Sequence, residues 1–221
     1  MRLTESKEGF DPGFADRMRE RTRLLHREAG RSGVVRDILR GRVSLEAYTV
    51  FLRNLLPAYR QLETSLDYHR RSPGIRLIAQ PVVYRAAALE SDLREIVGTA
   101  WRDRIPLLPA GDAYRQRIAE AATGHGERLI AHAYTRYLGD LNGGQALKRR
   151  LGDVLEFGPE SLSFYDFAGV SDIAAVRTQY RAAIDRSEDE IRDAAGVVEE
   201  AARSFADNIA ISVAVERSTA S

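Results

Sequence analysis

The chain has 221 residues, of which 33 are basic and 32 acidic, so its formal net charge is +1. This balance excludes binding to nucleic acid or membranes through net charge alone. The absence of cysteine excludes disulfides, zinc–thiolate sites, iron–sulfur clusters and thiolate ligation of other metals. The length fits one domain with a sizeable core.

The sequence shows no targeting or membrane-spanning segment. Its first residues, MRLTESKEGFDPG, lack the apolar stretch of a secretory signal, and the last, ERSTAS, are polar. No run of about 18 apolar residues is present. We therefore expect a cytoplasmic protein with no membrane partner.

Helical periodicity dominates the N-terminal third. A first helix is predicted over 13–29 because one face collects apolar residues, namely Phe14, Met18, Leu25 and Ala29. Gly30 and Gly33 then indicate a break. Ser44 is a predicted N-cap for a helix that reaches about residue 69, with a kink expected at Pro57.

The rest of the chain also has helical patterns, with loops expected around Pro106–Pro109 and from Gly158 through SFYDFAG. No segment alternates like a strand, and no repeat is present. The prediction is one all-α domain over 13–216, with a flexible segment at 1–12 and a polar tail at 217–221. The further helices are expected over 81–97, 112–122, 132–151, 172–193 and 196–216.

The stretch HAYTRYLGDLNGGQALKRRL, residues 132–151, reads as a helix despite its glycines. Gly139 and Gly143 are four residues apart and share a face, which Gly144 widens. Each costs a helix about 1 kcal/mol relative to Ala. A bare face lets a large flat ligand approach the backbone, and it lets the helix bend. The alternative is that Asn142-Gly143 simply ends one helix.

Arg136 and Asp140 lie four residues apart in the same stretch, so they are neighbours on adjacent turns. A carboxylate beside a ligand can hold a proton or an ordered water. An exposed Arg–Asp pair is equally an ordinary feature of a helix surface.

Among the four histidines, His26 is the candidate metal ligand. It borders the apolar face of the first helix, where a boundary packing role is the alternative. His69 and His125 lie in polar surroundings and are expected at the solvated surface. His132 is expected to be structural or exposed.

The residues 132–148, HAYTRYLGDLNGGQALK, closely resemble the signature helix of haem oxygenases. The resemblance extends over about 14–216 through LLHREA, YRAAALESDL, IPLLPA, SFYDF and VVEEAARSFADNI, in family order and spacing. It implies an all-α fold in which haem b lies between a proximal helix and a kinked distal helix, here the 132–151 helix.

The resemblance also implies roles for individual residues. His26 matches the proximal iron ligand, and Asp140 matches the distal acid that holds ordered water near the iron-bound oxygen. Three residues match the remainder of this hydrogen-bonded network: Tyr59, Arg136 and Asn208. The matches that contact haem are the distal glycines Gly139, Gly143 and Gly144, the edge aromatic Phe205, and the propionate contacts Arg19, Tyr134, Arg177 and Arg181.

The sequence departs from the family pattern at four positions. Asn142 stands where many members have Ser, and Arg replaces Lys at Arg19 and Arg177, which keeps the charge and alters the geometry. Gly30 stands where better-known members have an acid that orients the imidazole.

The function implied is the cleavage of haem to biliverdin, carbon monoxide and ferrous iron with O2. The chain has no dinucleotide or flavin motif, so a ferredoxin, a flavodoxin or an NAD(P)H-dependent reductase would supply electrons. A monomer is expected.

The sequence also leaves three other functions open. A haem carrier or sensor would need no proton-delivery network, so the Asp140 match argues against it. A di-iron oxidase would need paired Glu-x-x-His motifs, which the chain lacks. The arginines of segment 17–42 would suit a nucleic-acid binder, although acids interrupt them.

Overall fold

The central element of the protein is α3 (Leu45–Tyr68), in a computed structural model that describes residues 12–220. The predicted cap is confirmed, since the Ser44 hydroxyl accepts a hydrogen bond from the Ala47 amide at 3.1 Å. The helix continues through Pro57. Apolar and aromatic side chains on several of its faces are buried, among them Tyr48, Leu52, Leu55, Leu56, Tyr59, Leu62 and Leu66.

Three helices form the layer beneath α3. α1 (Phe14–Ala29) packs along α11 (Ala194–Thr219). The short α2 (Gly33–Leu39), which follows α1 in the chain, also packs against α11. The sequence predicted only a break around Gly33. Gly33 has φ +56°, and an added Cβ would lie 2.3 Å from the Ser212 carbonyl, so only glycine lets α2 dock this closely on α11.

The middle of the chain forms shorter helices. The predicted helix over 81–97 is split into η1 (Pro81–Val83) and α5 (Ala86–Val97). The physical reason is Glu63, whose carboxylate accepts the amides of Arg85 at 2.5 Å and Ala86 at 2.9 Å. α7 begins earlier than predicted, with Pro109 in its first turn. The elements of this part are α4 (Ile75–Ile78), η1, α5, α6 (Trp101–Arg104) and α7 (Pro109–Ala121).

The glycine-containing stretch is one continuous helical rod in three parts. α8 (Leu129–Ala133) leads into a π-helical turn, η2 (Tyr134–Leu138), which leads into α9 (Gly139–Leu155). The predicted continuity is confirmed. The departure from regular α geometry, however, lies in the turn before the glycines and not at the glycines themselves.

The last third ends its elements at different residues than predicted. The expected loop after Gly158 contains the 3₁₀ segment η3 (Pro159–Tyr165). α10 (Ile173–Ser187) starts at the predicted cap, with Asp172 accepting from the Ala175 amide at 2.9 Å, and it gives way to η4 (Glu188–Glu190). α11 continues to Thr219, so most of the expected tail is helical. The expected N-terminal segment, apart from Pro12, lies outside the described residues.

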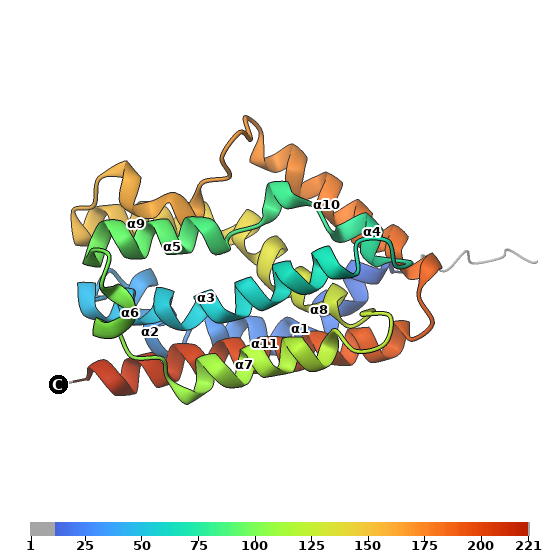
Figure 1. Ribbon diagram of the computed structural model, residues 1–221, viewed down its shortest axis with the longest axis horizontal. Coiled ribbons are helices and arrows are strands. Elements are labelled where there is room, and N and C mark those ends of the chain that lie inside the picture. The colour runs from blue at the N-terminus through green and yellow to red at the C-terminus, as the bar shows by residue number, and fades with distance from the viewer. Residues whose placement is uncertain (1–11, 221) are drawn as a thin grey trace, which may run out of the picture.

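Figure 1 shows how the helices are arranged in space. α5, α9 and α10 lie above α3, and α7 and α11 lie below it. The 12–220 region contains helices and turns and no strand, which confirms the all-α prediction. None of the helices in that region is both long and apolar enough to cross a membrane.

Candidate active site

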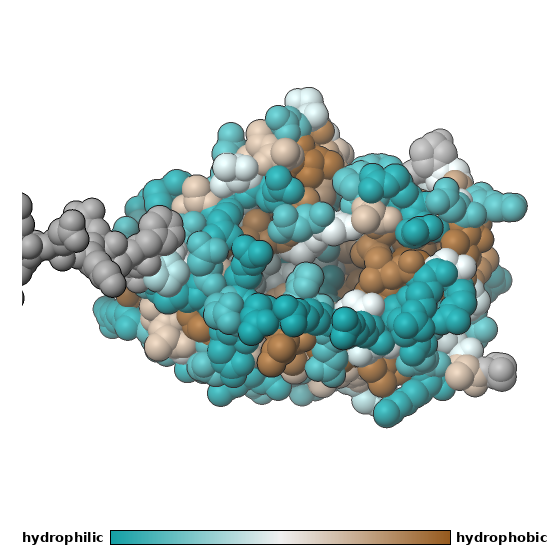
Figure 2. All heavy atoms as spheres, turned by 180° about the vertical axis from the view of Figure 1, so that it is seen from behind, coloured by the Kyte–Doolittle hydropathy of each residue, from teal (hydrophilic) through white to brown (hydrophobic). Residues whose placement is uncertain are grey.

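A cleft of about 740 Å³ separates α1 from the η2–α9 segment. Phe205 of α11 and Arg181 of α10 complete its walls. The side of the molecule that faces away in Figure 1 is hollowed near its centre, as Figure 2 shows, with hydrophilic residues along its lower border. The remaining lining residues are Arg19, Thr22, Arg23, His26, Arg27, Tyr134, Thr135, Leu138, Gly139, Asn142 and Gly143.

His26 occupies the α1 wall of this cleft. Its side chain is exposed, and its ring meets the ring of Phe205 edge-on at a centroid distance of 6.0 Å. One turn earlier, the Thr22 hydroxyl donates to the Met18 carbonyl at 2.8 Å. Phe14, Ala15 and Met18 of α1 are buried in the core, so the helix turns its apolar side inward and presents an accessible imidazole to the cleft.

Two of the three predicted glycines form the opposite wall. Apart from the helix's own neighbouring backbone, a Cβ added at Gly139 or Gly143 would meet no atom of the described residues within 4 Å, so the backbone there borders open space. Gly144 is buried outside the lining, where an added Cβ would lie 3.4 Å from the Tyr165 ring. Gly139 and Gly143 thus bare the cleft wall, while Gly144 lets α9 approach η3.

A hydrogen-bonded network lies directly behind the glycines. The Tyr59 hydroxyl donates to Asp140 Oδ2 at 2.6 Å and accepts from Arg136 Nε at 2.9 Å and Nη2 at 2.7 Å. Arg136 Nη1 also donates to Asn208 Oδ1, and its Nη2 lies 3.9 Å from Asp140 Oδ1. The structure brings these four sequence-predicted residues together from three separate segments of the chain.

Burial sets the protonation properties of this network. The Asp140 side chain is 11% exposed, and burial raises its pKa to about 6 against the opposing effects of Arg136, the Tyr59 hydrogen bond and Arg85. Burial also raises the pKa of Tyr59 well above its ordinary range, so Tyr59 keeps its proton. Asp140 can therefore exchange a proton near neutral pH, while the hydrogen bond from Tyr59 fixes the position of the Asp140 carboxyl.

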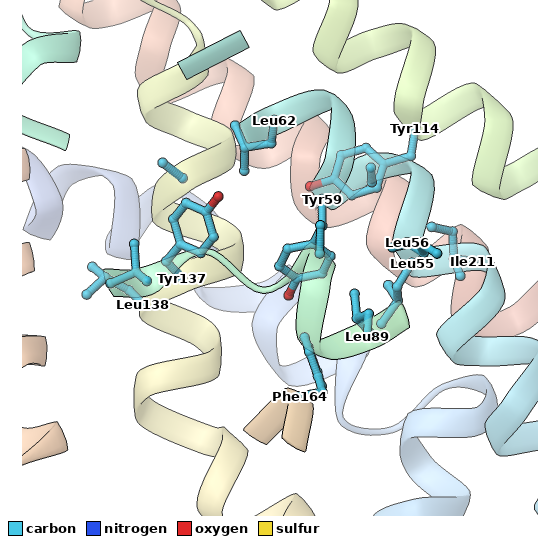
Figure 3. Close-up of a cluster of buried hydrophobic side chains, with 14 of the residues drawn as sticks. Leu55, Leu56, Tyr59, Leu62, Leu89, Tyr114, Tyr137, Leu138, Phe164 and Ile211 are labelled. Carbon is cyan, nitrogen blue, oxygen red and sulfur yellow. The ribbon is translucent and has the colours of Figure 1, made fainter. Parts of the chain in front are cut away.

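The segment η3 packs against the Tyr59 side of this network. The Phe164 ring packs edge-on against Tyr59 at 5.5 Å between centroids, and Figure 3 shows Tyr59 between Phe164 and Tyr137. Asp92 of α5 fixes this segment by accepting the amides of Ser163 and Phe164, each at 2.9 Å. Sequence reasoning missed Asp92, although an acid among the apolar residues of YRAAALESDL was a signal for a buried anchor.

Cations line part of the cleft. Arg19 and Arg181 are lining residues together with Tyr134, and Arg181 Nη2 pairs with Asp16 at 2.8 Å. Arg177, predicted to act with them, is outside the lining. Two arginines that were not predicted, Arg23 and Arg27, do line it. Their spacing of four and eight residues from Arg19 on one helix was the signal that could have found them.

One histidine differs from the prediction. His69 is buried rather than solvated, because it ends α3 against α7, where its Nε2 lies 2.8 Å from the Ala122 carbonyl. His132 is fully buried, with Nε2 3.3 Å from Glu200 Oε1, which agrees with the structural one of its two expected roles. His125 is exposed, as predicted. None of these three histidines lines the cleft. Among the described residues, His26 is therefore the histidine that does.

Comparison with known proteins places this architecture in one family. The family model described as heme oxygenase matches residues 12–214. Heme oxygenase 1 of Nostoc sp. is 37% identical over 199 residues, covering 89% of this chain and 83% of the relative. Heme oxygenase 1 of Rattus norvegicus is 33% identical, covering 89% and 69%.

Solved structures agree in fold and sequence. Heme oxygenase-1 from Synechocystis sp., in complex with heme, has a TM-score of 0.87 and 33% identity, with 94% of each chain covered. Heme oxygenase from Leptospira interrogans has a TM-score of 0.86 and 30% identity, covering 91% of this chain and 99% of that one. From its sequence, its fold and the geometry of its cleft, this chain belongs to the haem oxygenase family.

Proposed function

We propose that the cleft holds haem b with His26 as the iron ligand, and that the Asp140 network manages protons for its cleavage. As a haem oxygenase, the chain is an O2-dependent enzyme that converts haem to biliverdin, carbon monoxide and ferrous iron. The roles of the individual residues are the proposal.

The observation that carries these roles is the open space over Gly139 and Gly143, in the cleft that His26 lines from α1. The volume of about 740 Å³ is in the ordinary range of ligand sites. A flat ring in this space would lie against bare backbone on one side and an imidazole on the other. Neutral imidazole nitrogen is a common ligand of haem iron. The residues present therefore fit a haem.

The cationic lining fits the two carboxylates that haem carries. Arg19 and Arg181 would bind propionates, since guanidinium groups form strong paired hydrogen bonds to carboxylates. Tyr134 would add a hydroxyl donor. Arg177 is outside the lining, so its contribution would be long-range attraction. We propose that Phe205 seats the haem edge beside His26.

When bound, haem supplies the iron that binds and reduces O2. The chain's own contribution is to hold and deliver protons on the α9 side. Tyr59 occupies Asp140 Oδ2 and leaves Oδ1 available for water or a proton. Arg136 fixes Tyr59 through two hydrogen bonds and is itself fixed by Asn208. This rigid arrangement presents one proton-exchanging carboxyl beside the cleft.

We propose that the electrons come from a separate protein, a ferredoxin, a flavodoxin or an NAD(P)H-dependent reductase. Arginines cluster on α1 beside the cleft, and such a surface favours an acidic partner. We further propose a cytoplasmic monomer in which 13–216 is the catalytic domain, flanked by 1–12 and 217–221.

An optical titration with hemin tests the proposal. One equivalent should produce a Soret band, which reductant and air should convert to biliverdin absorption. His26→Ala should abolish this conversion, while His125→Ala, at an exposed site outside the cleft, should preserve it. A Soret band that survives reductant and air would instead identify a haem carrier or sensor.

A further inference from the structure

The arginine that α10 contributes to the cleft is already paired with carboxylates of the protein. Arg181 Nη2 lies 2.8 Å from Asp16 Oδ2, and its Nε lies 4.0 Å from Asp185 Oδ2. Asp16 belongs to the first turn of α1, so this ion pair joins α1 to α10 beside the cleft. A ligand carboxylate that reaches Arg181 therefore meets a guanidinium that two aspartates flank.

The two aspartates differ in what else they hold. Asp185 Oδ1 accepts the Ala15 amide at 2.8 Å, which fixes the first turn of α1. Asp16 forms no cap of that helix, and its carboxylate lies against Arg181. A carboxylate in a first turn also interacts favourably with the helix dipole, which is the structural explanation of Asp16. A test of any further role must separate the two.

The charges around Arg181 indicate that Asp16 opposes the binding of a carboxylate ligand. Asp16 and Arg19 are three residues apart on α1, so they are neighbours on adjacent turns. Burial raises the pKa of Tyr134, the two arginines lower it and Asp16 raises it, so all three charges act at that hydroxyl. Asp16 and Asp185 together offset Arg19 and Arg181, which leaves this part of the cleft without excess positive charge.

We propose that Asp16 competes with a haem propionate for Arg181 and thereby weakens the binding of carboxylate ligands in the cleft. The inference rests on the proposed seating of haem between α1 and α9. Haem is held by its propionates and by His26, whereas biliverdin keeps both carboxylates and has lost the iron. The carboxylate contacts are therefore a larger share of what holds the product. Asp16 acts through Arg181, as a positioning residue that favours product release.

The exposure of the pair sets the size of the effect. The side chains of Arg181 and Asp16 are 36% and 40% exposed, so solvent screens the attraction between them. Removing the charge of Asp16 should therefore tighten ligand binding by a factor of about two to five. Among related complexes, most of such a difference lies in the dissociation rate.

Absorbance titrations of Asp16→Asn with biliverdin and with hemin test the competition. Both ligands should bind about two- to fivefold more tightly than they bind the wild type, and biliverdin should dissociate more slowly. The dimethyl esters of both ligands lack the free carboxylates, so they should bind the wild type and Asp16→Asn equally. In an Arg181→Gln background, Asp16→Asn should leave the affinities unchanged.

Glu199→Gln is the matched control, because it removes an equal charge from another ion pair of α1. Glu199 Oε2 lies 2.8 Å from Arg21 Nη2, and both residues are exposed and outside the cleft lining. This variant should bind both ligands as the wild type does.

Three results would overturn the competition. They are unchanged or weaker binding of biliverdin by Asp16→Asn, tighter binding of the esters by that variant, and an equal effect of Glu199→Gln. The esters also separate the competition from the structural explanation, because a change in α1 would alter their binding too. Failure of the proposed function would look different, since no variant would then show a Soret band with hemin.

Discussion

The carboxyl group of Asp140 is subject to two opposing influences. Burial favours its protonated form, and the neighbouring Arg136 favours its charged form. Burial has the larger effect, so the pKa rises from 3.8 to about 6. A shift of this size corresponds to about 3 kcal/mol of unfavourable free energy when the group ionises in the folded protein.

This shift predicts how Asp140→Asn changes the pH dependence of stability. Between about pH 4 and pH 6 the unfolded chain releases the Asp140 proton and the folded chain retains it, so the contribution of Asp140 to wild-type stability falls as pH rises. The unfolding free energy of the wild type, taken relative to that of the variant, should decrease by about 3 kcal/mol in total and stop changing above about pH 7. Urea unfolding of both proteins across this range measures it. A wild-type-minus-variant difference that is flat with pH would contradict the shift.

At the residue scale, sequence identified the chemistry of the site better than its supports. Tyr59, Arg136, Asp140 and Asn208 were predicted through the family motif, and the structure brings them into one network. Asp92 was missed, because its partners, two backbone amides and the Ser163 hydroxyl, lie about 70 residues away in sequence. For His132 the sequence left a structural and an exposed position open, since the choice depends on how α8 packs against α11.

At the element scale, the glycines Gly139 and Gly143 lower the helix propensity of α9 and leave its backbone uncovered on the face toward the cleft. The open space over Gly139 predicts that Gly139→Leu leaves the fold intact, because outside the helix's own backbone no atom of residues 12–220 lies within 4 Å of the added Cβ. The leucine side chain would enter the cleft, so hemin affinity should fall at least tenfold. Gly152→Leu is the matched control, since Gly152 lies on the same helix over open space away from the cleft. Equal hemin affinities in the two variants would show that α9 does not face the ligand.

The contact between α2 and α11 predicts a stability difference between two neighbouring glycines. Gly33→Ala forces a side chain into positive φ and against the Ser212 backbone, so unfolding free energy should drop by at least about 2 kcal/mol. Gly30 has φ −73°, and an added Cβ would make only ordinary contacts. Gly30→Ala should therefore change stability by less than about 1 kcal/mol. Thermal or urea unfolding distinguishes them, and similar losses would contradict the docking argument.

Element boundaries were predictable where a local signal sets them. Ser44 and Asp172 cap helices at their predicted positions because a side-chain oxygen two or three residues from an amide is a local feature. The start of α5 was not predictable, since it depends on Glu63, which is remote in sequence. The π-helical turn before Gly139 likewise left no mark in the apolar pattern.

At the scale of the whole molecule, four helical segments that are distant in sequence line the cleft. α1 supplies His26, η2 and α9 supply the bare wall, α10 supplies Arg181 and α11 supplies Phe205. Periodicity alone predicted an all-α domain. The pairing of α1 with α9 across a cleft came only from the resemblance to a family, because helical patterns do not specify which helices face one another.

The central claim is that the Asp140 carboxyl provides the proton chemistry of haem cleavage and not the binding of haem. The most direct measurement is the biliverdin formed per haem by Asp140→Asn, with reductant and air, beside its hemin affinity. We expect wild-type affinity with biliverdin reduced to a trace, whereas Asp112→Asn, an acid on the distant α7, should form biliverdin normally. Wild-type yield and rate from Asp140→Asn would contradict the account.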